Sequence, residues 1–174
     1  MATVFLAACG SSGNEATPSP TPLPTASLEE RAYFQELQTA MQQIRQESTA
    51  VADFRSHAFD AGLTEADRLR RGSEYGTHYA TFASGRQTRL SAINAPVSVK
   101  TLHSQLTDAA AATKQLSDDL NARLATKPVG ADADLTGLFI ELDGATLEQR
   151  FRDGCTDLQR RAAGRGVSVD LACS

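Results

Sequence analysis

The chain has 174 residues and a net charge of −4 at pH 7, from 17 lysines and arginines against 21 aspartates and glutamates. This acidic balance argues against a nucleic-acid partner, which calls for a basic face, and against a polybasic contact with anionic lipid. Tryptophan is absent and aromatic residues make up 6% of the chain, so the composition gives little sign of an aromatic binding platform. No stretch of the sequence approaches the ~20 apolar residues that a membrane-spanning helix needs.

The N-terminal residues contain a candidate lipid-attachment site. Leu6-Ala7-Ala8-Cys9 is followed by small and polar residues at positions 10–14. This order resembles the signal of bacterial lipoproteins, in which a dedicated peptidase cuts before the cysteine and the cysteine becomes the lipid-bearing N-terminus. The resemblance implies a lipid such as palmitate on Cys9 and a lipid-anchored location on the extracytoplasmic face of the cell membrane.

Residues 1–9 are short for a signal peptide. Such a peptide has a charged n-region and an apolar stretch of about 7–15 residues, whereas no Lys or Arg precedes Cys9 here. We therefore expect the true start codon to lie upstream, with residues 1–9 being the end of a truncated signal. The alternative is a chance tetrapeptide, and a protein made from Met1 as written would stay in the cytoplasm.

Residues 10–26 predict a tether between this anchor and the domain. They are almost entirely Gly, Ser, Thr, Pro, Ala and Asn, and every second residue from Pro18 to Pro24 is proline. Prolines stiffen a chain toward polyproline II, a spacer of roughly 3 Å per residue. Residues 27–174 remain for the domain, about 148 residues, which is enough for a single core.

The first predicted helix begins at Ser27 and runs to about residue 58, before Gly62. Ser27 and Glu30 have the spacing of a capping box, in which each side chain satisfies a free backbone donor of the first turn. Positions three and four residues apart then form one stripe along the helix. The stripe consists of Phe34, Leu37, Met41, Ile44, Ser48 and Val51.

The second predicted helix begins at Thr64, with Asp67 three residues on. Arg86 interrupts its stripe, and two glycines in it cost about 1 kcal/mol each relative to alanine. The glycines indicate either a closely approaching neighbour helix or a local kink. The stripe consists of Leu69, Gly72, Gly76, Tyr79, Ala83, Leu90 and Ile93.

A third helix is predicted from Pro96, placed near the first turn, to Pro128, and a fourth, shorter one ends at Gly164. Residues 129–143 read as irregular or as a short helix. Short connections make such helices antiparallel neighbours, so the predicted fold class is all-α, an up-down bundle of about four helices. The two stripes consist of Val99, Leu102, Leu106, Ala109, Thr113, Leu116 and Leu120, and of Leu147, Phe151, Leu158 and Ala162.

Cys155 and Cys173 predict a disulfide. If Cys9 carries lipid, these two remain as an even pair in an oxidising compartment. After Gly164 the sequence alternates apolar and polar residues up to Cys173, which is typical of an extended segment with one buried side. Doubling back along the fourth helix would bring this tail to Cys155. The alternative is two buried free thiols.

Three histidines, His57, His78 and His103, are the first candidates for a metal site. Their places near different ends and in the middle of the predicted helices put them at different heights of the bundle. We therefore expect three partly exposed helix histidines rather than a shared site, and we assign no metal and no cofactor.

A second candidate is the segment from Asp132 to Asp143. Asp132, Asp134, Gly137 and Asp143 have the spacing of positions one, three, six and twelve of an EF-hand calcium loop. Thr136 at position five and an aspartate rather than glutamate at position twelve depart from that pattern. The preferred interpretation is a polar connection with helix-capping aspartates, and calcium binding stays the alternative.

Catalytic motifs are missing from the sequence. It has no Gly-x-Ser-x-Gly, no phosphate-binding loop, no dinucleotide glycine motif and no His-Glu-x-x-His. Arg160, Arg161 and Arg165 cluster near the end of the fourth helix, where they complement the helix dipole. A solvated basic face is the interpretation we prefer for them over an anion site.

The end of the chain resembles the tails of bacterial lipoproteins and secreted helical proteins of undefined activity. It has a Cys155-x-x-Leu158-Gln159 helix segment and a Val169-Asp170-Leu171-x-Cys173 ending. Residues 93–96 with 102–103 are similar to a Pro-then-Leu-His helix start in the same proteins, although Val97 replaces their usual second proline. The resemblance implies a helical exported domain and no particular activity.

Together these patterns predict a lipid-anchored, extracytoplasmic helical protein, non-catalytic, that acts as a binding or envelope component. The membrane is its expected partner through the lipid on Cys9, and nucleic acid is not. One alternative is a ligand- or metal-carrying bundle at the membrane surface. The other is an enzyme with an unrecognised site.

Overall fold

The computed structural model describes residues 25–173, and within that range it consists of α-helices without strands. This confirms the predicted all-α fold, a helical bundle. Cys9 and most of the predicted tether lie outside the described residues. The helices are α1 (Leu28–Ala58), α2 (Glu65–Ala92), α3 (Lys100–Thr126), α4 (Asp132–Glu141) and α5 (Gly144–Gly164).

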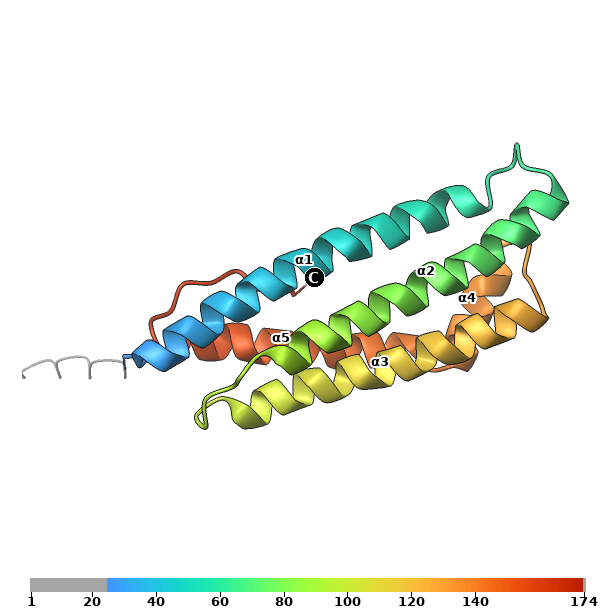
Figure 1. Cartoon of the computed structure of the whole chain (residues 1–174). Helices are drawn as coiled ribbons and strands as arrows, with labels where there is room; N and C mark the ends of the chain where they lie inside the picture. The colour runs from blue at the N-terminus through green and yellow to red at the C-terminus, as the bar shows by residue number, and fades with distance from the viewer. Residues whose placement is uncertain (1–24, 174) are drawn as a thin grey trace, which may run out of the picture.

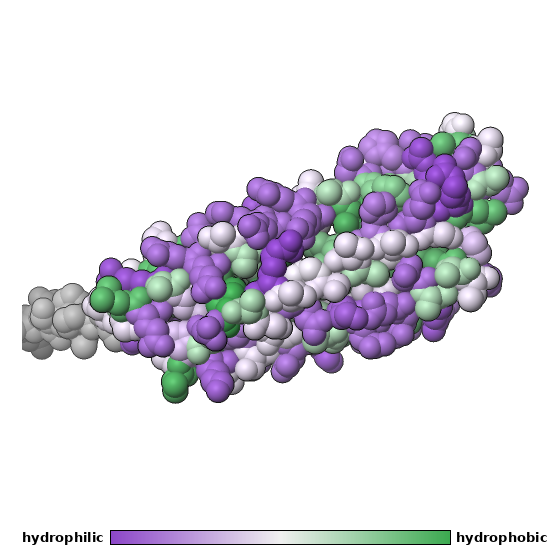
Figure 2. All heavy atoms as spheres, in the orientation of Figure 1, coloured by the Kyte–Doolittle hydropathy of each residue, from purple (hydrophilic) through white to green (hydrophobic). Residues whose placement is uncertain are grey.

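Four of these helices run along one long axis, and the short α4 lies at one end of the bundle, behind α2 in the view of Figure 1. α2 packs against both α1 and α3, and α3 packs against α5. The residues after α5 turn back along the bundle. On the face shown in Figure 2, hydrophilic residues cover most of the surface, and hydrophobic residues are visible in the furrow between α1 and α2.

The two predicted N-caps are confirmed. The Ser27 hydroxyl accepts a hydrogen bond from the Glu30 amide at 3.1 Å, and the Glu30 carboxylate accepts one from the Ser27 amide at 2.9 Å. The Thr64 hydroxyl accepts one from the Asp67 amide at 3.1 Å. Each bond satisfies a backbone donor that the first helical turn leaves unpaired.

One element begins later than expected, and one open alternative is decided in favour of a short helix. α3 begins at Lys100 rather than at Pro96, because residues 96–99 close a turn in which the Val99 amide donates to the Pro96 carbonyl at 3.0 Å. Residues 132–141 form helix α4, of which Leu135 is buried. Asp132 and Asp134 stand in its first turn, where negative charge is favourable.

The core follows the predicted stripes. Phe34, Leu37, Leu106, Leu120 and Leu158 are all fully buried. Gly76 marks the close approach of a neighbour helix, one of the two explanations that the sequence offered, whereas Gly72 lies against the connection between α3 and α4. A Cβ on Gly72 would stand 2.3 Å from the Val129 carbonyl oxygen, and one on Gly76 would stand 3.2 Å from the Cα of Asn121 in α3.

Glu30 joins three segments at one end of the bundle. Its side chain is 2% exposed. Besides the Ser27 amide it accepts a hydrogen bond from the Ser98 hydroxyl at 2.7 Å, in the α2–α3 connection, and one from Arg165 Nη2 at 2.9 Å, at the end of α5. These donors, Arg165 above all, hold the pKa of Glu30 at about 2, below its ordinary value of 4.5.

Glu30→Gln tests this junction. Because the pKa of Glu30 is lower in the folded state than in the unfolded state, its charge stabilises the fold above pH about 5, and that contribution is lost as the pH falls toward 2. We expect Glu30→Gln to lower the free energy of unfolding by about 1–3 kcal/mol at pH 7. Urea unfolding at several pH values should show this deficit shrinking between pH 5 and pH 2.

Glu29→Gln is the matched control for that measurement, since Glu29 is an exposed carboxylate of the same helical turn. Its unfolding curve should follow the unsubstituted protein. A Glu30→Gln deficit that stays constant across the acid range would contradict the charge argument.

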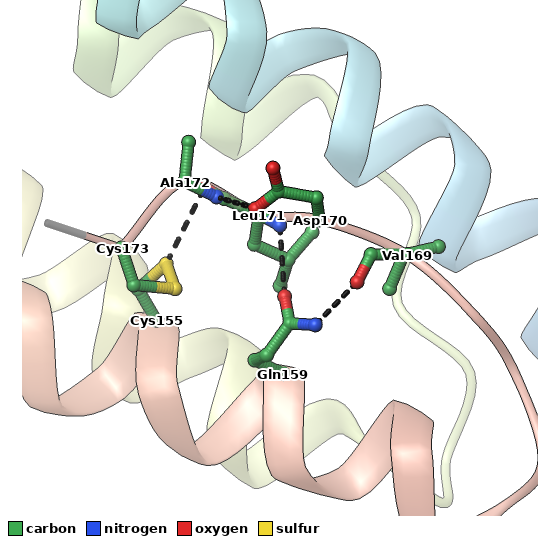
Figure 3. The surroundings of a disulfide bond; sticks show 7 residues. All are labelled: Cys155, Gln159, Val169, Asp170, Leu171, Ala172 and Cys173. Carbon is green, nitrogen blue, oxygen red and sulfur yellow. Dashed lines mark hydrogen bonds between the residues drawn. A yellow bond between two sulfur atoms is a disulfide. The ribbon is translucent and has the colours of Figure 1, made fainter.

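The tail, residues 166–173, lies between α1 and α5 (Figure 3). Gly166 adopts φ 71°, a left-handed conformation that glycine reaches without strain, and turns the chain back after α5. The predicted period of two is observed: Val167 and Val169 are half-buried, Leu171 is buried, and the two residues between them are exposed.

A disulfide between Cys155 and Cys173 fixes the end of this tail, as predicted, with 5.5 Å between the two Cα atoms. Gln159, one turn after Cys155, binds the tail backbone (Figure 3). Its Oε1 accepts a hydrogen bond from the Leu171 amide at 2.8 Å, and its Nε2 donates to the Val169 carbonyl. The side-chain amide therefore pairs with the tail as a neighbouring strand would.

Gln159→Ala removes this pairing and leaves one amide and one carbonyl of a partly buried tail without partners. We expect a loss of about 1–3 kcal/mol in the free energy of unfolding, measured by urea with the disulfide intact. Gln149→Ala is the control on the same helix, because that amide bonds only exposed side chains. Equal losses for the two variants would show that Gln159 does not hold the tail.

Candidate functional site

A cleft of about 290 Å³ opens beside the second half of α1. Residues of α1, α2, α4 and α5 line it, and Ala172 and Cys173 at the end of the tail form part of its wall. The disulfide thus connects one wall of the cleft to α5. Its lining combines aromatic side chains, arginines and a single carboxylate.

The carboxylate belongs to Glu148, in the first turns of α5, and it pairs with Arg86 of α2. Arg86 Nη1 and Nη2 each donate to one oxygen of Glu148 at 3.2 Å. The Tyr79 hydroxyl donates to Oε1 at 3.1 Å. Glu148 therefore already accepts three hydrogen bonds and is neutralised by a fixed cation.

Arg86 is 2% exposed, which is unusual for a charged residue. Its guanidinium carbon lies 4.3 Å from the ring centre of Phe151 and 5.3 Å from that of Phe82. Such cation–π contacts offset part of the cost of burying the charge. Arg86 Nε is buried and has no hydrogen-bond partner among residues 25–173, so this part of the structure does not fully satisfy the guanidinium.

The two tyrosines of the cleft remain protonated. Burial raises the pKa of Tyr79, and the negative charge of Glu148 raises it further. Burial also raises the pKa of Tyr75, although Arg55 opposes that shift. Both hydroxyls are therefore neutral at physiological pH, and neither adds negative charge to the lining.

Three further arginines line the cleft. Arg55 Nε donates to Asp132 Oδ1 and its Nη2 to the Thr136 hydroxyl, both at 2.7 Å, which ties α1 to α4. Arg152 bonds the neutral amide oxygen of Gln149 at 2.9 Å. Among the described residues, no carboxylate forms an ion pair with Arg152 or with Arg45.

The sequence singled out little of this cleft. Arg86 was visible only as an interruption of the α2 stripe, and that interruption is the signal that could have located it. Glu148 lies beside Leu147 on an amphipathic helix and carries no pattern of its own. The low aromatic content indicated no binding platform, yet Tyr75, Tyr79, Phe82, Phe139 and Phe151 all line this one cleft.

The histidines lie apart on the helices, with His57 and His78 exposed. His103 corrects our expectation of partial exposure: it is buried, its Nδ1 lies 3.1 Å from the Tyr33 hydroxyl, and burial lowers its pKa. Within residues 25–173, no group of three His, Cys, Asp or Glu side chains is placed to hold a metal ion.

The EF-hand alternative does not fit the backbone. Asp132, Asp134 and Gly137 belong to helix α4 and not to a loop. Asp132 instead pairs with Arg55, and Asp143 occupies a left-handed position, φ 57°, between α4 and α5. The capping interpretation is also inexact, because the N-cap of α4 is Ala131 and no side chain caps it.

The arginine cluster at the end of α5 is more than a solvated face. Arg165 pairs with the buried Glu30, and Arg161 Nη2 donates to the Ser98 carbonyl at 3.4 Å. Arg160 alone fits the expectation, since it is exposed and bonds Asp157 of its own helix.

Comparison of the chain with protein-family models, with curated proteins and with solved structures found no match. None of the helices between residues 25 and 173 combines the length and the apolar character needed to cross a bilayer.

Proposed function

We propose that this protein is a lipid-anchored, non-catalytic binding protein of the extracytoplasmic face of the membrane, and that it holds a small ligand in the cleft beside α1. The observation that carries the proposal is the buried Arg86, which lies against two phenylalanine rings at the cleft and pairs with the half-buried Glu148. The proposed protein is thus both the lipid-anchored binding component and the ligand-carrying bundle that the sequence patterns suggested as separate possibilities.

The composition of the cleft supports binding. Ligand sites are concave and largely apolar, with a few polar groups that fix the orientation of the ligand. Stability alone does not call for a buried ion pair, since well-packed apolar residues in its place are often neutral or stabilising. The volume of about 290 Å³ suits a small ligand rather than a polymer.

The position of the cleft is compatible with an anchor on Cys9. The described chain enters the bundle at Ala26, whose amide donates to the Arg165 carbonyl at 3.0 Å. The cleft-lining part of α1, from Arg45 to Arg55, lies about 25–40 Å along the helix from the N-cap Ser27. A lipid attached before the tether would thus leave the cleft open to solvent.

Binding in the cleft can be tested with N-phenyl-1-naphthylamine, a neutral probe that fluoresces in apolar surroundings. Ser48 lines the cleft, and a phenylalanine there would fill part of it. We expect the purified chain to bind the probe and Ser48→Phe to weaken binding about tenfold, a loss of about 1.4 kcal/mol.

Ser56→Phe is the matched control, because both serines lie on α1 and donate to the carbonyl three residues earlier, while Ser56 does not line the cleft. It should bind the probe as the unsubstituted chain does. No binding by the unsubstituted chain, or equal binding by both variants, would count against the cleft as the site.

The anchor can be tested in a bacterial host with the chain expressed behind a lipoprotein signal peptide that ends at Cys9. We expect the protein to incorporate a palmitate analogue and to sediment with membranes, and Cys9→Ser to abolish both because the lipid-bearing sulfur is gone. Ser11→Ala should behave as the unsubstituted protein. Equal release of the Cys9→Ser and unsubstituted proteins into the soluble fraction would refute lipidation.

A further inference from the structure

We infer that the ligand of the cleft is a small organic anion with an apolar body: a carboxylate, sulfonate or phosphate group joined to a hydrophobic, ring-sized part. This inference rests on the proposed function, because it specifies what the same cleft binds. It is carried by the charge and the chemistry of the side chains around the cleft.

The lining of the cleft has a net positive charge, whereas the protein as a whole is negatively charged. Four arginines line the cleft against the single carboxylate of Glu148, whereas the whole chain has a net charge of −4. Arg86 neutralises Glu148 and Arg55 is paired with Asp132. The positive charge left over belongs to Arg45 and Arg152.

Arg45 and Arg152 are suited to meet an anion. They come from α1 and α5, two different helices that both line the cleft, and both residues are exposed. Guanidinium groups present several donors in a plane and bind carboxylate and phosphate oxygens in pairs. Arg86 is less suited to that role, because it is buried and its charge is already neutralised by Glu148, to which both of its terminal nitrogens donate.

The aromatic lining is suited to the rest of the ligand. Phe82, Phe139 and Phe151 offer ring surfaces without hydrogen-bonding groups. Among the described residues that line the cleft, Glu148 is the one carboxylate that a cationic ligand could meet, and it already accepts three hydrogen bonds. A ligand that places an anionic group at the two arginines and a ring against the phenylalanines would contact both parts of the lining.

Two probes that share one ring scaffold separate charge from apolar contact: 8-anilinonaphthalene-1-sulfonate and the neutral N-phenyl-1-naphthylamine. At low salt we expect the sulfonate to bind the full chain about tenfold more tightly than the neutral probe. Added salt should reduce that preference, because it screens exposed charges. Salt should leave the neutral probe's affinity nearly unchanged.

The Arg45→Gln/Arg152→Gln variant should remove the tenfold preference and leave the neutral probe's affinity as it was. Arg31→Gln/Arg150→Gln is the matched control: it removes the same charge from the same two helices at exposed positions outside the cleft lining. That control should keep the preference. Because all four positions are exposed, the fold is expected to survive, which circular dichroism can verify.

The outcomes distinguish this inference from the function on which it rests. Binding of the neutral probe in the cleft without a preference for the sulfonate overturns the anion inference alone. Equal losses in the two double variants overturn it as well. Binding of neither probe overturns the proposed function and the inference together. Displacement of the sulfonate by 1-naphthoate, by 1-naphthyl phosphate or by both supports the anion class and shows which head group is preferred, whereas displacement by neither contradicts it.

Discussion

The carboxylate of Glu30 is the point on which the arrangement of the helices depends. It is buried at the first turn of α1, and it receives hydrogen bonds from the α2–α3 connection through Ser98 and from the end of α5 through Arg165. A buried carboxylate requires such donors, since an unpaired charge in the interior is costly. One residue therefore fixes α1 relative to helices that are remote from it in sequence.

The tail, which lies between α1 and α5, runs along part of α1 and ends at the cleft. Gln159 and the disulfide hold the tail on α5, while Ala172 and Cys173 form part of the cleft wall. Beyond that point Arg55 links α1 to α4. The same elements that stabilise the bundle thus define where the cleft begins and ends.

The helices could be predicted because their signals are local. The capping residues Ser27 and Thr64 and the three–four spacing act within a few residues, and the alternating tail made the disulfide predictable as well. The cleft could not be predicted, because it depends on which faces of four helices meet. Arg86 looks like a defect in its stripe until Glu148 and Phe151, more than sixty positions away, are placed against it. The spacing of the aspartates in residues 132–143 could not by itself decide between the preferred non-calcium interpretation and the EF-hand alternative, because a spacing that fits a calcium loop also fits a short helix with aspartates in its first turn.

The junction of Ala26 with Arg165 has a mechanical consequence. A force applied to the chain before Ala26 would first load the hydrogen bond from Ala26 to the Arg165 carbonyl and then the ion pair between Arg165 and Glu30. That load would pass into the end of α5 as well as into α1, so α1 would not be peeled from its neighbours alone. The Arg86–Glu148 pair lies outside this line of force, and a domain pulled at its first residues would keep its cleft intact until the Glu30 junction failed.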